Sequence, residues 1–182
     1  MSALSYVPLE LLLLAVVAGC AAAYAVARPA WLRGEPYVAA SRASRVLLVG
    51  AIAAVLAVTL TGGEPGGAAN GINLMPGDGI RRSLLNRDRD LGLLNLAGNV
   101  AMFVPVALLL PVATGLRWRH CVSLCALGSL GIEIAQLSLG RAFDIDDVLL
   151  NSLGAVLGAS LGVVLAGGFR RARDRHAGRP SP

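Results

Sequence analysis

The feature that most constrains this chain is a series of long apolar runs that contain very few charged residues. Five such runs cover approximately residues 9–27, 46–61, 93–114, 121–139 and 148–166. A helix of about 20 apolar residues is long enough to cross the hydrocarbon core of a bilayer. The chain is 55% hydrophobic with a mean hydropathy of +0.67, more apolar than a soluble domain of 182 residues needs to be. We therefore predict an all-α, polytopic transmembrane helix bundle of about five spans, embedded in a lipid bilayer.

The connections between the runs differ in length. Residues 28–44 are predicted to be a loop. The second run has 16 residues and would be roughly 24 Å long as a helix, which is too short to cross the bilayer. We expect it to reach spanning length by adding Ala43 to Arg45, with the arginine side chain snorkelling to the membrane surface. Residues 62–92 are the long connection, and within it residues 80–91 fit either a short surface helix or a solvated loop. The basic segment from residue 170 to the end is expected to be disordered and to lie against anionic headgroups.

The arginines predict how the chain sits in the membrane. The sequence has sixteen arginines and no lysine, with a net charge of +5, but the arginines flank the apolar runs, so we expect no nucleic-acid partner. Eleven arginines fall in the first and third connections and the tail, against five in the N-terminal segment and the other two connections. The positive-inside rule then places the N-terminus outside and the C-terminus in the cytoplasm. The Ala-, Gly- and Arg-rich composition suggests a bacterial source. We therefore expect a multi-pass protein of the bacterial cytoplasmic membrane.

The start of the chain also resembles processing signals, because Val17-Ala18-Gly19-Cys20 fits a lipoprotein cleavage box. A cleaved signal needs a positively charged segment before the apolar run. The first ten residues contain no arginine or lysine and include Glu10. We therefore expect the first run to be retained as a transmembrane helix.

Polar residues concentrate near the predicted outer ends of the last three runs. Glu133 and Gln136 are three residues apart and share a helix face, while Arg141 lies in the gap that follows them. The remaining members of this group are Asn95, Asn99, Asp144, Asp146, Asp147 and Asn151. Because the topology puts all of them at one depth, we expect them to converge on the extracytoplasmic side.

Four interpretations of these residues stay open. In a structural lock, Arg141 would bridge Glu133 and an aspartate while asparagines bond across helices. In a binding site for an amphipathic or cationic ligand, Asn95, Asn99, Gln136, Arg141 and Asn151 would contribute. In a catalytic site, Glu133 would act as acid or base with Asp144, Asp146 or Asp147 as partners. Whether the protein is an enzyme is left open.

The fourth interpretation is a divalent metal bound by Asp144, Asp146 and Asp147. Their D-x-D-D spacing is similar to sets that bind hard cations, but the loop glycine and distal glutamate of an EF-hand are missing. We predict no metal site and no cofactor. Asp144 or Asp146 would also serve as caps of the fifth helix.

Glycine repeats every four residues in the fifth run, at Gly154, Gly158 and Gly162. Small residues at this spacing let another helix approach closely, so the repeat predicts a packing ridge. At 100° per residue, Asp147 and Asn151 lie on the same side of this helix as Gly154 and Gly158. The acids and the ridge should therefore point into one seam.

Taken together, these motifs resemble the VanZ-like family of bacterial membrane proteins. The resemblance rests on Asn73-Leu74-Met75-Pro76, Asn99-x-x-x-Phe103-x-Pro105, Glu133-x-x-Gln136 and Gly140-Arg141-x-Phe143-Asp144-Ile145-Asp146-Asp147-x-x-x-Asn151-x-x-Gly154-x-x-x-Gly158. It covers more than half the chain, and one departure is Ala107, where the family often has glycine. It divides the chain into two N-terminal spans and the start of the outer loop (1–71), a three-span VanZ-like domain (72–166) and a basic cytoplasmic tail (167–182).

The resemblance implies a role in the bacterial cell envelope, because the namesake of the family confers low-level teicoplanin resistance. A cell-wall precursor or a glycopeptide is then an expected partner. The alternatives are a membrane-embedded enzyme that acts on lipid-linked precursors or lipids, and a structural helix bundle with no site. A family resemblance does not by itself transfer a phenotype, so resistance is a hypothesis for this chain.

Overall fold

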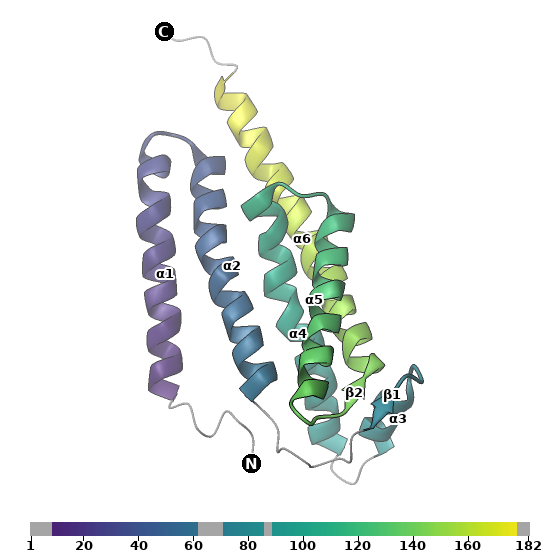
Figure 1. Ribbon diagram of the computed structural model, residues 1–182. Helices are drawn as coiled ribbons and strands as arrows, with labels where there is room; N and C mark the ends of the chain where they lie inside the picture. Colours follow the sequence, from purple (N-terminus) through teal and green to yellow (C-terminus); the bar gives the residue numbers. More distant parts are fainter. Residues whose placement is uncertain (1–8, 62–70, 86–88, 178–182) are drawn as a thin grey trace.

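The computed structural model describes residues 9–61, 71–85 and 89–177 and shows a bundle of long helices (Figure 1). Five helices are long and apolar enough to cross a membrane, which confirms the predicted fold class. The elements in chain order are α1 (Leu9–Leu32), α2 (Pro36–Thr61), β1 (Ile72–Asn73), α3 (Asp78–Leu85), α4 (Arg89–Thr114), α5 (Trp118–Ser138), β2 (Phe143–Asp144) and α6 (Ile145–Ala177).

The predicted loop over residues 28–44 is wrong, because both flanking helices extend into it. α1 continues through Pro29 to Leu32, and α2 begins at Pro36, which leaves a three-residue connection. Gly34 adopts φ +74°, a left-handed conformation that ends α1. Proline is well suited to the first position of a helix, so Pro36 starts α2 rather than prolonging a loop.

α2 therefore needs no snorkelling arginine to reach spanning length. The Arg45 Nε instead donates to the Ala113 carbonyl oxygen at 3.0 Å, and the Ser41 hydroxyl donates to the same oxygen at 3.2 Å. This carbonyl lies in the last turn of α4, where no helical N–H is left to bond it. Arg45 and Ser41 thus join α2 to the end of α4.

The C-terminal segment also differs from its prediction, because α6 continues to Ala177 instead of ending near residue 166. The guanidinium groups of Arg170 and Arg173 lie 6.0 and 5.6 Å from the ring centre of Tyr37 on α2. Cation–π contacts of this kind stabilise the added turns against α2. Residues 178–182 of the predicted disordered tail lie outside the described residues.

The predicted glycine ridge is confirmed, and it sets the distance between α4 and α6. A Cβ added to Gly154 would lie 2.0 Å from the Val100 carbonyl oxygen, and one on Gly158 would lie 2.3 Å from that of Val104. Any side chain at these positions would force the two helices apart. Ala107, the departure from the family pattern, is fully buried and would lie 3.0 Å from a Cβ on Gly158.

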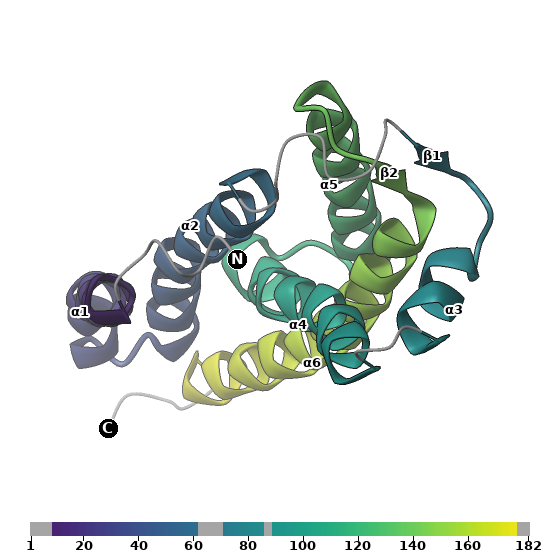
Figure 2. The same cartoon turned by 90° about the horizontal axis from the view of Figure 1, so that it is seen from below.

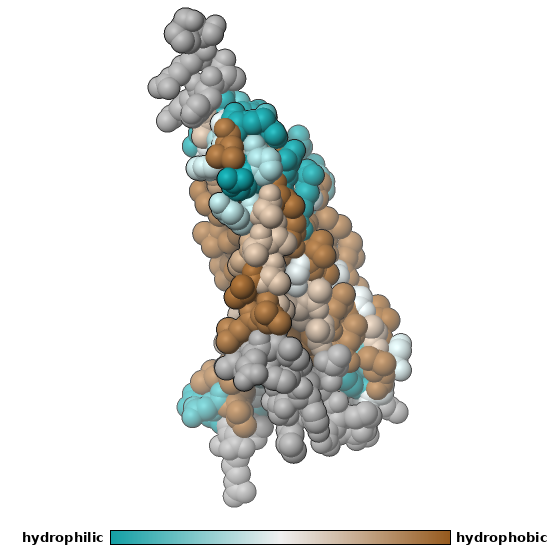
Figure 3. Space-filling view, turned by 90° about the vertical axis from the view of Figure 1, so that its left-hand side faces the viewer, coloured by the Kyte–Doolittle hydropathy of each residue, from teal (hydrophilic) through white to brown (hydrophobic). Residues whose placement is uncertain are grey.

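The elements divide the molecule into two ends. α1 lies at the edge of the bundle beside α2, and α4 crosses close to α6 (Figure 2). Hydrophobic side chains cover the middle of the face shown in Figure 3, and hydrophilic ones gather toward the end that carries the C-terminus. That end holds the α1–α2 and α4–α5 connections, while β1, β2 and α3 lie at the other end (Figure 1). We call the latter the site end.

Candidate functional site

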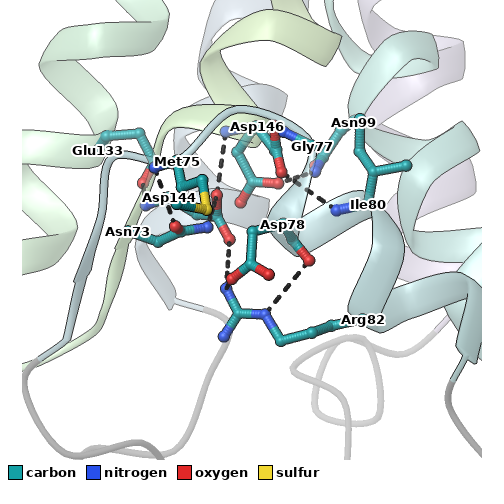
Figure 4. Close-up of polar contacts among 11 residues, drawn as sticks. Asn73, Met75, Gly77, Asp78, Ile80, Arg82, Asn99, Glu133, Asp144 and Asp146 are labelled. Atoms are coloured by element: carbon teal, nitrogen blue, oxygen red, sulfur yellow. Dashed lines mark hydrogen bonds and ion pairs between the residues drawn. The ribbon is translucent and has the colours of Figure 1, made fainter.

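A short parallel strand pair brings two distant parts of the chain together at the site end. Ile72 and Asn73 of β1 lie opposite Phe143 and Asp144 of β2, and the Phe143 N–H donates to the Gly71 carbonyl oxygen at 3.1 Å. This pairing was not predicted from the sequence. It places the segment after β1, including α3, directly against the acidic start of α6 (Figure 4).

Asp144 caps α6 and joins the cluster to α5. Its Oδ1 accepts hydrogen bonds of 3.0 Å from the Asp146 N–H and from the Asn73 side-chain amide. The bond to Asp146 is the N-cap arrangement that the sequence predicted for this position. The Asp144 N–H in turn donates to Glu133 Oε2 at 3.0 Å (Figure 4).

Asp146 caps a helix as expected, but the helix is α3 rather than its own. Its Oδ1 accepts from the Gly77 N–H at 2.7 Å, and its Oδ2 accepts from the Ile80 N–H at 3.1 Å. Gly77, which precedes α3, adopts φ +89° and has no side chain with which to cap the helix. The carboxylate of Asp146, only 2% exposed, takes over that role from α6.

The contact between α3 and the acids is tight and carries an ion pair. A Cβ on Gly79 would lie 2.5 Å from Asp144 Oδ2, so only glycine fits there without displacing the carboxylate. Arg82, one turn further along α3, pairs with Asp78 at 3.3 Å and with Asp144 at 3.8 Å. Because the Arg82 side chain is 62% exposed, these pairs add little stability and mainly orient the arginine.

Two further polar pairs cross between the spanning helices. The Asn99 amide on α4 donates to Asp147 Oδ1 on α6, and the Asn151 amide donates to the Ser129 hydroxyl on α5 at 2.8 Å. Asp147 and Asn151, which the helix spacing predicted to share one side of α6, thus join that helix to α4 through Asn99 and to α5 through Ser129. Asn151 Oδ1 is buried and has no partner among the described residues.

The arginine of the predicted structural lock bonds elsewhere. The Thr59 carbonyl oxygen, in the last turn of α2, accepts from Arg141 Nη1 at 2.6 Å and from Gln136 Nε2 at 2.8 Å. Arg141 acts electrostatically on Glu133 and Asp147, but the described part of the chain contains no ion pair between it and either acid. The predicted bridge from Glu133 through Arg141 to an aspartate is therefore wrong.

Not every predicted residue joins the cluster. Asn95 lies one turn before Asn99 on α4 and is exposed, so it remains outside the network described above. Ser129 and Thr59 were missed by the sequence reasoning. Ser129 had a usable signal, because it is a small polar residue four positions before Glu133 on the same face of an apolar helix. Thr59 contributes a backbone carbonyl, which leaves no sequence signal.

The hydrogen bonds assign different roles to the four acids. Both oxygens of Asp146 accept from backbone N–H groups, while Asp144 accepts from a backbone N–H and an amide and forms an ion pair with Arg82. Glu133 is 3% exposed and accepts from one backbone N–H, while Asp147 accepts from Asn99. Asp144 and Asp146 are therefore structural caps, and Glu133 and Asp147 are the acids available for ligand binding or proton transfer.

Within the described ranges, no group of three or more His, Cys, Asp or Glu side chains has the geometry to hold a metal ion. The polar cluster offers carboxylates, amides and the guanidinium groups of Arg82 and Arg141 instead. Such a set can bind a ligand that carries both positive charge and hydrogen-bonding groups. It can also transfer protons through Glu133 or Asp147.

Comparison with known proteins identifies one family. A model of the VanZ/LLP1 family matches residues 45–166, about two-thirds of the chain. The match begins in α2 and ends in α6, so it includes both strands, α3 and every residue of the polar cluster. No curated protein and no solved structure matches the chain.

Proposed function

We propose that this protein, which belongs to the VanZ/LLP1 family, lowers the susceptibility of a bacterial cell to glycopeptides such as teicoplanin through the polar cluster at its site end. The observation that supports this most is the position of the cluster. It lies at the end of the bundle opposite the α1–α2 and α4–α5 connections and the C-terminal turns of α6, and that opposite end carries most of the arginines, in the ends of its helices as well as in the connections (Figure 1). By the positive-inside rule the site end faces outward from the cytoplasmic membrane.

An outward-facing cluster has access to the compartment where glycopeptides meet cell-wall precursors. Glycopeptides are amphipathic and carry amino groups, which suits a site with spare carboxylates at the membrane surface. Glu133 and Asp147 would attract the positive charge, while Asn99, Gln136 and Arg141 set the hydrogen-bonding geometry of the site. The role is one of binding or of controlling access, and it requires no chemical step.

Conservative variants at the two available acids test this proposal. Glu133→Gln keeps an oxygen that accepts from the Asp144 N–H, and Asp147→Asn keeps one that accepts from Asn99, so both variants should reach the membrane in normal amounts. Expressed in a susceptible bacterium, each should lose the protection against teicoplanin that the wild type gives. Unchanged protection at normal abundance would refute a role for the cluster.

A second candidate is a membrane-embedded enzyme that acts on lipid-linked cell-wall precursors or lipids. It is favoured by the burial of Glu133 within α5, where an acid that only packed helices together would be costly. Deletion of the protein should then change the pool of one lipid or lipid-linked precursor, measured by mass spectrometry of membrane extracts. Glu133→Gln should produce the same change as the deletion. If both pools match the wild type, the cluster has no enzymatic role.

A further inference from the structure

An apolar cavity of about 240 Å³ lies between α2, α4 and α5 and is open on one side, where its lining residues Ile52, Leu56 and Leu124 are 42%, 40% and 50% exposed. Its lining includes Val55 on α2, Phe103 and Val106 on α4, and Cys125, Gly128 and Ile132 on α5. Gly128 helps to create the space, because a Cβ built there would meet no atom within 4 Å. The lining on α5 extends from Leu124 to Ile132, roughly 12 Å along the helix at 1.5 Å per residue. The shape suits a single extended chain better than a compact ligand.

The cavity begins one helical turn from the polar cluster on each of its three helices. Val55 precedes Thr59 by four residues, and Ile132 precedes Gln136 by four. On α4 the order is reversed, with Phe103 four residues after Asn99. A turn rises about 5.4 Å, so the apolar lining starts directly beneath the residues that make up the cluster.

Arg141 marks the polar end of this cavity. Its Nη1 donates to the carbonyl oxygen of Thr59, the residue one turn above Val55. A guanidinium has five N–H donors in a planar arrangement that matches phosphate oxygens. The side chain is half-buried, and among the residues described it forms no ion pair. It therefore has donors to offer to an anion.

The charges around Arg141 indicate what kind of headgroup fits. Glu133 and Asp147 interact electrostatically with Arg141, and Asp144 follows it by three residues. A purely anionic headgroup would meet these carboxylates. A headgroup with both a phosphate and an ammonium can place the phosphate on Arg141 and the ammonium beside the acids.

We propose that the cavity holds one acyl chain of a phospholipid whose zwitterionic headgroup binds with its phosphate at Arg141 and its ammonium beside the Glu133 and Asp147 carboxylates. The ligand class is thus a bilayer lipid of the phosphatidylethanolamine type. The proposal deepens the function proposed above, since the headgroup occupies the same polar cluster. An amphipathic ligand at the membrane surface would then meet a lipid already bound at the cluster. It would either displace that lipid or bind against it.

Photolabelling in nanodiscs tests the proposal with matched variants. The probe is phosphatidylethanolamine that carries a diazirine in its acyl chain, and the label is mapped by peptide mass spectrometry. Gly128→Phe should reduce labelling of α2 and α5 about tenfold, which corresponds to about 1.4 kcal/mol. The control is Gly131→Phe, because Gly131 is also an exposed α5 glycine with nothing within 4 Å of its Cβ but does not line the cavity. Equal labelling of the two variants would overturn the proposal.

Competition separates the headgroup from the chain. Unlabelled phosphatidylethanolamine should compete with the probe better than phosphatidylglycerol does, and Arg141→Gln should remove most of this preference. Equal competition by the two lipids in the wild type would refute the zwitterionic assignment.

A cysteine at an exposed lining position gives a second measurement without a bulky substitution. In a variant whose three native cysteines are replaced by alanine, Leu124→Cys, at a lining position that is 50% exposed, should react with a lipophilic maleimide in lipid-free detergent and be protected by added phosphatidylethanolamine. Identical rates would contradict a lipid in the cavity. These binding measurements do not depend on teicoplanin, so the lipid proposal and the resistance proposal can fail separately.

Discussion

The docking of α3 on the acidic start of α6 predicts a large local effect for Asp146→Ala. The carboxylate accepts from two backbone N–H groups, at 2.7 and 3.1 Å, and is 2% exposed. Hydrogen bonds to a charged group contribute about 1.5–3 kcal/mol each, which gives an upper limit of about 3–6 kcal/mol for the pair. Water can reach the exposed Gly77 and the half-buried Ile80 once the carboxylate is removed, so part of this energy is recovered.

The measured loss should therefore be close to that of a helix cap, about 1–2 kcal/mol and at most about 3 kcal/mol. The other end of α3 stays in place, because a Cβ on Gly92 of α4 would lie only 2.1 Å from the Ser83 carbonyl oxygen. Asp146→Ala should thus loosen the first turn of α3 without unfolding the spanning helices. A loss of about 1–2 kcal/mol corresponds to an increase in local opening of about fivefold to thirtyfold.

Hydrogen exchange measured by mass spectrometry in nanodiscs provides the assay. Peptides that cover residues 77–85 should exchange faster in Asp146→Ala, while peptides from α5 should exchange at the wild-type rate. The matched control is Asp78→Ala, which removes a carboxylate from α3 itself but breaks only an exposed ion pair with Arg82. Its effect should be below about 0.5 kcal/mol. If the two variants change α3 equally, Asp146 is not the anchor of this helix.

Two further predictions concern helix packing and orientation. Gly154→Ala should reduce stability in a detergent or denaturant unfolding assay by about 1–3 kcal/mol or more, because its Cβ would lie 2.0 Å from the Val100 carbonyl oxygen. Gly98→Ala is the control: nothing lies within 4 Å of its Cβ, so it should be neutral or stabilising by up to about 1 kcal/mol, and equal losses would contradict the packing seen here. In a background without native cysteines, Leu85→Cys on α3 should react with an impermeant thiol reagent on intact cells, and Arg171→Cys should not. The opposite pattern would show that the site end faces the cytoplasm.

The sequence predicted the number of spanning helices because length and apolarity decide whether a helix crosses a bilayer. It did not predict their ends. Pro29, Gly34 and Pro36 resemble loop residues, yet Pro29 lies within α1 and Pro36 starts α2. The arginines near residue 170 resemble a disordered tail. Two of them, Arg170 and Arg173, nevertheless contact the ring of Tyr37 in the first turn of α2. Local backbone preferences of Gly34 and Pro36 decided the first case, and contacts with a distant residue decided the second.

The contacts of the candidate site were likewise predictable only in part. Helix periodicity predicted that Asp147 and Asn151 share one side of α6, and each bonds there to a side chain on a neighbouring helix, Asn99 on α4 and Ser129 on α5. Periodicity carries no information about bonds to the backbone. Asp146 accepts from the Gly77 and Ile80 amides, and Arg141 donates to the Thr59 carbonyl oxygen. Those partners are defined by the strand pair and the end of α2, which only the folded structure shows.

This division of roles determines which substitutions are informative about function. A variant of Asp144 or Asp146 removes a helix cap, so its loss of activity would follow from a displaced α6 terminus or α3 whatever the chemistry of the site. Glu133 and Asp147 can each be replaced by an amide that keeps the observed acceptor and removes only the charge. A phenotype in these two variants, with normal exchange in α3, would therefore report on the carboxylates themselves. Asp144 and Asp146 thus form a structural pair that holds the site in shape. Glu133 and Asp147 form a second pair that is available to a ligand.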